Sequence, residues 1–192
     1  KAMANGYPIS AIGGREDIMR LCRSGGVTHG GTYTAGAMPL AAAERTLRIL
    51  RDTDALDTIR RTGERVQAGL SQVIGSRGLP YVFTGHPSMF GIMFTEQVPH
   101  EYRDWANSDH ELYDAVAVGM QARGAMPEPD SREPWFICES HAEGDQVDRI
   151  VSIFADALDA ALETRAHRQP MARLRRARWG ASRAACAARW RP

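Results

Sequence analysis

Residues 1–14 read KAMANGYPISAIGG, and they begin with the only lysine among 192 residues, against 23 arginines. Within this stretch, residues 8–14 predict a short buried strand that is entered from a loop containing Gly6 and Pro8. An amine condenses with an aldehyde only when it is unprotonated, and burial disfavours the ammonium form. Lys1 beside a buried strand is therefore a candidate Schiff-base former, although a lysine at a chain terminus is more often simply solvated.

The composition is that of an ordinary globular chain, with 43% hydrophobic and 24% charged residues. No run of residues approaches the roughly 20 apolar residues that a membrane helix needs. Cys22, Cys138 and Cys186 are odd in number and far apart. They predict neither a disulfide framework nor a zinc site, and a reducing cytoplasm is the expected location.

The net charge of +1 conceals two unlike regions. Residues 165–192 hold nine arginines and no acidic residue, so the rest of the chain has 15 basic against 23 acidic residues. We expect residues 164–192 to form a disordered, solvated extension. Clustered arginines can also neutralise the phosphates of a nucleic acid or a membrane, and a tail of this composition also arises when a GC-rich gene is read out of frame.

The order of periodic segments predicts an α/β fold. Residues 24–34, SGGVTHGGTYT, form a Gly-rich loop that can wrap its backbone closely around a ligand. The apolar spacing predicts helices over residues 15–22, 35–51, 54–74, 109–123 and 144–162, and strands within residues 80–85, 88–95 and 135–140. In the second of these strands, Met89, Phe90, Ile92 and Phe94 are expected in the core.

The opening stretch resembles the segment around the cofactor lysine of class III aminotransferases, which are fold-type I pyridoxal-phosphate enzymes. In that pattern a lysine precedes small residues, Gly-x-Pro, and a small apolar strand that closes on Gly-Gly. The matching positions here are Lys1, Gly6, Pro8, Ala11, Gly13 and Gly14. About thirty residues later the family has Gly-Thr in a Gly-rich loop before an Ala-rich helix, and this chain has Gly31-Thr32.

Within this class, the glutamate-1-semialdehyde aminomutase group is the most similar. SMFGIMFT at residues 88–95 and EPWFICESHAEGDQVDRIV at residues 133–151 resemble two of its later motifs, in the same order. The resemblance covers about residues 1–162. It departs at residues 34–37, where Thr-Ala-Gly-Ala replaces the family's Ser-Gly-Asn-Pro.

The resemblance implies the C-terminal part of a fold-type I enzyme. The expected parts are a remnant of the large cofactor domain at residues 1–52, a small α/β domain at residues 53–163, and the basic tail. It also implies that Lys1 holds pyridoxal phosphate as an internal aldimine and then acts as general base and acid. Gly31 and Thr32 would bind the cofactor phosphate. In the family this threonine reaches the cofactor of the partner subunit, so a homodimer is expected.

Other candidate residues are less specific. Glu133 precedes His141 by eight residues and matches a family glutamate near the substrate entrance, although a solvated loop acid fits equally well. Tyr33 is a candidate for the substrate pocket or for packing. His29 and His141 have no metal-ligand spacing. We interpret His29 as loop structure and His141 as a hydrogen-bonding residue at a strand end.

Three parts of the family's pocket precede the lysine: a Gly-rich phosphate turn, an aromatic residue that stacks on the cofactor ring, and an aspartate that pairs with the ring nitrogen. We therefore expect that this polypeptide alone is not a competent transaminase. The expected activity of the parent is amino-group transfer on a small amino acid, amine or amino-aldehyde. The alternatives are glutamate-1-semialdehyde 2,1-aminomutase and, from another class, a non-catalytic module whose Arg-rich tail binds nucleic acid.

Overall fold

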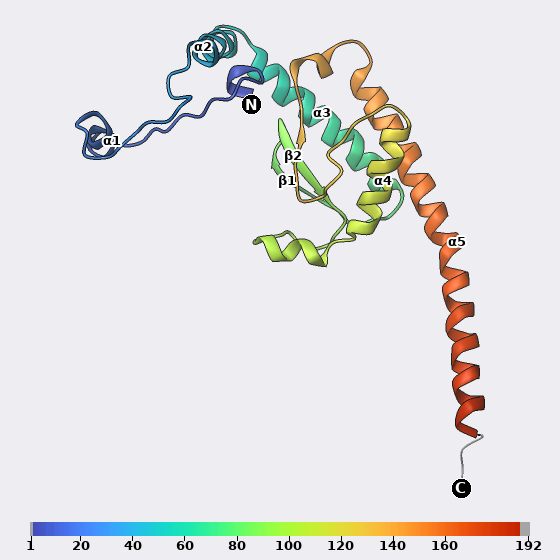
Figure 1. Cartoon of the computed structure of the whole chain (residues 1–192). Coiled ribbons are helices and arrows are strands. Elements are labelled where there is room, and N and C mark those ends of the chain that lie inside the picture. The colour runs from blue at the N-terminus through green and yellow to red at the C-terminus, as the bar shows by residue number, and fades with distance from the viewer. Residues whose placement is uncertain (1, 189–192) are drawn as a thin grey trace. The chain divides into compact units, whose positions relative to one another are not determined.

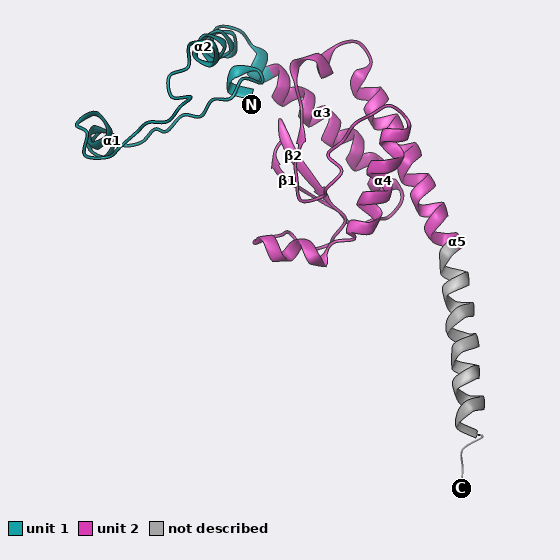
Figure 2. Cartoon of the chain, viewed as in Figure 1, with its two compact units in different colours: residues 1–57 teal, residues 58–192 magenta. Residues whose placement is uncertain are grey.

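The computed structural model describes residues 2–188, and it describes side chains for residues 2–167. Two compact units make up the chain, residues 1–57 and residues 58–192 (Figure 2). The sequence-based boundaries at residues 52 and 163 stay predictions.

Unit 1 consists of helices and loops. Its elements are the 3-10 helix η1 (Ala2–Ala4), α1 (Glu16–Arg23) and α2 (Ala37–Asp52). Two acidic residues open α1 and two arginines lie in its last turn, which complements the helix dipole. Pro39 lies in the first turn of α2, where a missing N–H costs little. The helices predicted over residues 15–22 and 35–51 are thus confirmed.

The strand predicted for residues 8–14 is wrong. These residues have no regular structure and are mostly exposed, with Ile12 at 61% exposure. A strand is stabilised by ladder hydrogen bonds to a neighbouring strand. Among residues 2–57 no other strand is described, so the apolar segment has nothing in its own unit to pair with.

Unit 2 contains a three-stranded antiparallel sheet and three long helices (Figure 1). The strands lie in the order β1 (Val82–His86), β2 (Met89–Met93) and β3 (Trp135–Phe136). A tight turn at residues 87–88 joins β1 to β2, and Val82 pairs with Met93. The helices are α3 (Ala55–Ser76), α4 (His110–Ala122) and α5 (Gln146–Ala188), and the short 3-10 helices are η2 (Tyr102–Asn107) and η3 (Glu139–Ala142).

Two elements differ in length from their predictions. β3 has two residues in place of the expected six, because the chain turns into η3 after Ile137 donates its N–H to the carbonyl of Ser88. α5 continues past Leu162 to Ala188. Alanine and arginine are good helix formers, which accounts for the helix over residues 164–188, where a disordered tail was predicted.

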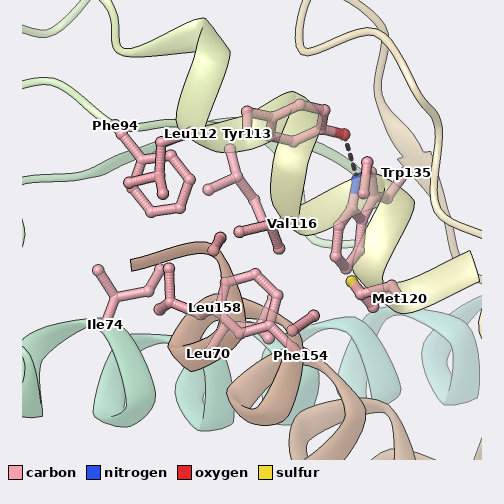
Figure 3. Packing of buried hydrophobic residues seen from close by; sticks show 14 of the residues in the cluster. Leu70, Ile74, Phe94, Leu112, Tyr113, Val116, Met120, Trp135, Phe154 and Leu158 are labelled. Carbon is pink, nitrogen blue, oxygen red and sulfur yellow. Dashed lines mark hydrogen bonds between the residues drawn. The ribbon is translucent and has the colours of Figure 1, made fainter. Parts of the chain in front are cut away.

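Buried side chains of the three helices and of the sheet form the core of unit 2 (Figure 3). Leu70 and Ile74 of α3 meet Phe154 and Leu158 of α5, and all four are fully or almost fully buried. The sheet contributes Phe90 and Ile92, and Phe94 lies just beyond β2. These three predicted core residues are confirmed.

Met89 is the exception among the residues predicted for the core. That prediction is wrong, because its side chain is 47% exposed. Met89 is the first residue of β2 and points to the face opposite Phe90. Among the described residues, no helix has the length and apolar content to cross a lipid bilayer.

Candidate active site

The predicted catalytic residue, Lys1, lies outside the described residues. The chain directly after it turns sharply: Asn5 and Gly6 both have positive φ, and the N–H of Tyr7 bonds the carbonyl of Ala4 at 3.2 Å. η1 contacts α2, and Ala4 is fully buried. The residues that follow Lys1 are therefore held on the α2 side of unit 1.

The predicted phosphate-binding residues lie in one turn of unit 1. The N–H of Thr34 donates to the carbonyl of Gly31 at 3.0 Å, and the N–H of Gly36 donates to the carbonyl of Tyr33 at 3.3 Å. Within residues 2–188, the N–H groups of Gly31 and Thr32 have no hydrogen-bond partner. Thr32 is exposed. Two free N–H groups beside a free hydroxyl can bind phosphate oxygens, so these residues fit the expected group.

The turn leads directly into α2, whose N-terminal end carries no acidic side chain in its first turn. The positive end of a helix dipole favours an anion nearby. Ala35, with φ at 57°, brings the chain from the turn into the helix. The local electrostatics are thus compatible with a bound phosphate.

Tyr33 lies in the same turn and is 85% exposed. Its ring therefore packs against little of the described chain, which leaves it available to a ligand. His29 is an exposed loop residue, as interpreted from the sequence. No cluster of three or more metal-ligating side chains occurs in the part of the chain that the structure describes.

Glu133 belongs to unit 2, where it lies exposed on the loop between α4 and β3. Its N–H donates to the carbonyl of Asp130 at 3.0 Å. A pair of charged residues fixes the turn before Glu133, because Arg132 donates hydrogen bonds to both carboxylate oxygens of Asp130. These bonds hold the pKa of Asp130 at about 2, well below its ordinary value.

An indole holds this loop against η2. The Nε1–H of Trp105 donates to Oγ of the buried Ser131 at 2.7 Å, and the guanidinium carbon of Arg132 lies 4.9 Å from the centroid of the Trp105 ring. Arg132 also donates to the hydroxyl of Tyr102 at 3.0 Å. Contacts within the loop and contacts to η2 therefore both hold the backbone that carries Glu133 in place.

An apolar hollow of about 390 Å³ lies beside the same loop. Pro127, Pro134, Trp135 and Phe136 line it together with the imidazole of His141, and Glu133 is not among the lining residues. The N–H of Cys138 donates to Nδ1 of His141 at 3.0 Å, which confirms that His141 is a hydrogen-bonding residue. It lies in η3 and not at the end of β3, so that part of the interpretation is wrong. In the sequence, only the Pro-rich segment at residues 127–134 points to this part of the molecule, and by itself it predicts a loop and not a hollow.

The structure therefore brings Gly31, Thr32 and Tyr33 together and places Glu133 in the other unit. Trp105 and Arg132, which position the Glu133 loop, are functional residues that the sequence patterns do not predict. Their residue types are the only indication in the sequence, because no sequence motif connects a tryptophan and an arginine that lie 27 positions apart.

Comparison with known proteins gives consistent results. The family Aminotransferase class-III matches residues 1–158. Glutamate-1-semialdehyde 2,1-aminomutase of Methanosarcina acetivorans is 33% identical over 146 residues, which are 76% of this chain and 34% of that protein. The same enzyme of Bacillus subtilis is 29% identical over 146 residues, again 76% of this chain and 34% of that protein.

Two solved structures are similar in fold. The Sphingopyxis FumI protein, in its PLP internal aldimine form, has a TM-score of 0.71 and 30% identity over 85% of this chain and 36% of its own. An omega-transaminase from Sphaerobacter thermophilus has a TM-score of 0.70 and 28% identity over 83% of this chain and 37% of its own. The chain spans about a third of the length of the proteins that it matches.

Proposed function

The chain belongs to the class III aminotransferase family, and from this premise we propose that it supplies the lysine and one phosphate-binding turn of a pyridoxal-phosphate-dependent site for amino-group transfer. The substrate class is a small amino acid, amine or amino-aldehyde. The observation that carries the proposal is the turn at Gly31 and Thr32, where free N–H groups and a free hydroxyl are presented together.

Pyridoxal phosphate, when bound, supplies an aldehyde that condenses with amines and a ring that accepts electrons from the substrate carbon. In this proposal Lys1 provides the amine that holds the cofactor and then carries a proton away from and back to the reacting carbons. Arginine cannot replace it there, because a guanidinium keeps its proton at all physiological pH values. That difference explains why one lysine is present in a chain that otherwise uses arginine.

Gly31 and Thr32 serve binding in this proposal. Their N–H groups and the Thr32 hydroxyl donate to phosphate oxygens, which orients the group without taking part in proton transfer. Tyr33, exposed in the same turn, and Glu133, on the loop held by Trp105, are candidates for substrate contact. We further propose that the site is completed in a homodimer, with Thr32 facing the cofactor of the partner subunit.

A second candidate, glutamate-1-semialdehyde 2,1-aminomutation, is favoured by the names of the curated relatives in Methanosarcina acetivorans and Bacillus subtilis. The two activities share a first half-reaction and differ in whether nitrogen returns to the same molecule. The distant alternative, nucleic-acid binding by the Arg-rich tail, depends on residues 168–192, whose side chains lie outside the described ones.

The test begins with the chain itself. It is incubated with pyridoxal phosphate and treated with borohydride, and the labelled peptide is identified by mass spectrometry. We expect the label on the side-chain nitrogen of Lys1, its loss in Lys1→Arg, and weaker labelling in Thr32→Val. Thr46→Val is the matched control, because the Thr46 hydroxyl bonds the carbonyl of Ala42 within α2.

The substrate is assigned with a polypeptide of the relatives' full length that contains this sequence. It is assayed with glutamate-1-semialdehyde and, separately, with amine donors and pyruvate. The chain alone should show no amine turnover. Labelling that is unchanged in Lys1→Arg and in Thr32→Val would contradict the proposed site. Full amine turnover by the chain alone would contradict the expectation that the chain alone is not a competent transaminase.

A further inference from the structure

The hollow of about 390 Å³ in unit 2 has mostly apolar walls. Met120 and Trp135, both buried, line it and lie close together (Figure 3). Met126 and Phe136 also line it, but they are 94% and 66% exposed, so their apolar surface faces water. Ligand sites in proteins have volumes of this order and walls of this kind. The hollow is therefore large enough to take a small organic molecule.

The walls of the hollow are held in place by proline rings and by one shared hydroxyl group. Three lining residues are prolines, whose rings fix their own backbone φ angles. They are Pro127, Pro129 and Pro134. The hydroxyl of Tyr113 joins two further lining residues, because it donates to the carbonyl of Glu128 at 2.6 Å and accepts from Nε1–H of Trp135 at 2.7 Å. A site whose walls are fixed beforehand loses less entropy when a ligand binds.

One lining residue, Glu128, gives the hollow a negative charge. It is the single acidic side chain among the described residues that line the hollow, and none of these residues is an arginine or a lysine. Glu128 is partly buried, and within residues 2–167 its carboxylate forms no hydrogen bond or ion pair. A carboxylate that is partly removed from water is stabilised by a positive charge beside it. The hollow therefore favours a cation over an anion.

The charge of Glu128 also acts inside unit 2. Burial raises the pKa of Tyr113 to about 12, and the negative charge of Glu128 adds to this rise. A charge that acts on a buried hydroxyl group is not fully screened by water. The same charge acts on a molecule bound in the hollow, which strengthens the attraction between Glu128 and a cation.

An organic cation fits the hollow better than a metal ion does. Metal ions in proteins take several oxygen, nitrogen or sulfur ligands. Besides Glu128, the polar residues that line the hollow are Gln121 and His141, and Nδ1 of His141 already accepts the N–H of Cys138. Apolar walls, in contrast, match the carbon skeleton of an organic ammonium ion.

We propose that the hollow binds a small ammonium compound with an aromatic or branched apolar body. Its ammonium group pairs with the Glu128 carboxylate, and its apolar body covers Met126 and Phe136. All the lining residues belong to unit 2. None of them has a role in the proposed function, so this inference goes beyond that function and does not rest on it.

Binding is measured by nuclear magnetic resonance on the isotope-labelled full chain at about pH 8, where an alkylammonium group is charged, and without pyridoxal phosphate. The probes are phenethylamine, phenethyl alcohol and hydrocinnamate, which share a phenyl body and carry a positive, a neutral and a negative group. The amine should shift the signals of residues 125–128 and 134–137, including the indole N–H of Trp135. It should bind about fivefold more tightly than the alcohol, and hydrocinnamate should bind most weakly.

Substitutions separate the contribution of the charge from that of the apolar wall. Glu128→Gln should make the amine and the alcohol bind equally. Glu163→Gln is the matched control, because Glu163 is an exposed glutamate on α5 that does not line the hollow. Met126→Ala should weaken the binding of the amine and the alcohol alike, by about threefold. Val118→Ala should leave both unchanged, because Val118 is exposed on α4 outside the hollow.

Four outcomes overturn the proposal. They are no binding of the amine, equal binding of amine and alcohol by the wild type, tighter binding of hydrocinnamate than of the amine, and amine binding that Glu128→Gln does not change. Shifts in residues 125–137 that appear when the chain alone is concentrated would identify a second copy as the occupant and also overturn it. Lys1→Arg should bind the amine as the wild type does. Loss of the label from Lys1 and loss of amine binding are therefore separate results.

Discussion

Gly63 on α3 lies directly against the carbonyl group of Pro87 in the turn between β1 and β2. A Cβ atom at Gly63 would stand 2.0 Å from the Pro87 oxygen and 2.5 Å from its carbonyl carbon. No side chain fits at that distance, so the absence of a Cβ allows the hairpin to approach the helix. This contact sets how closely the β1–β2 turn approaches α3.

Gly63→Ala should lower the free energy of unfolding by about 1–3 kcal/mol, because the turn must move away from the helix to accept a methyl group. Gly75→Ala on the same helix is the matched control. A Cβ at Gly75 meets nothing within 4 Å, and alanine is the better helix former by up to about 1 kcal/mol. Urea unfolding of both variants measures the difference, and equal effects would contradict the contact.

Tyr113 links three segments of unit 2 through its hydroxyl group. It donates to the carbonyl of Glu128 at 2.6 Å and accepts from Nε1–H of Trp135 at 2.7 Å (Figure 3). Tyr113→Phe removes both bonds and leaves a buried indole N–H without its partner, which should cost about 1–3 kcal/mol. Tyr102→Phe is the control, because Tyr102 is 71% exposed and its loss should change stability by less than about 0.5 kcal/mol.

Burial raises the pKa of Tyr113 from its ordinary value of 10 to about 12. The folded state therefore holds the phenolic proton more tightly than the unfolded state does. This stabilisation is fully present below pH 10 and is lost as the pH rises from 10 to 12, by about 2–3 kcal/mol in total. Urea unfolding at several alkaline pH values should show this slope in the wild type and a shallower one in Tyr113→Phe.

The Trp105–Ser131 contact is expected to hold the loop that carries Glu133. Trp105→Phe removes the hydrogen bond to Ser131 and should speed amide exchange in residues 127–134 several-fold while α4 stays protected. Ser131→Ala removes the same bond from the other side. The two substitutions together should therefore cost less than the sum of their separate effects on stability. Strict additivity would show that the bond does not contribute.

Local patterns in the sequence account for the helices and the hairpin. The apolar spacing that predicts helices over residues 15–22, 35–51 and 109–123 matches α1, α2 and α4 closely. A helix makes its hydrogen bonds within its own segment, so its signal is local. The β1–β2 hairpin is local for the same reason, since two residues join its strands.

The family motifs were likewise decided by sequence, because Lys1 and the Gly31–Thr32 pair are identified by residue type and order. The match over residues 1–158 confirms the family to which these motifs pointed. The roles of these residues remain predictions, as do those of Tyr33 and Glu133.

The tertiary structure alone decided which segments find partners. Residues 8–14 have the composition of a buried strand, yet no strand of unit 1 is described beside them. Met89 is apolar, yet its side chain at the first position of β2 is 47% exposed. Trp105 and Ser131, 26 positions apart, meet only because the chain returns to η2. The physical reason is the same in each case: burial and strand pairing depend on what lies across from a residue in space, and one segment of sequence does not contain its neighbour.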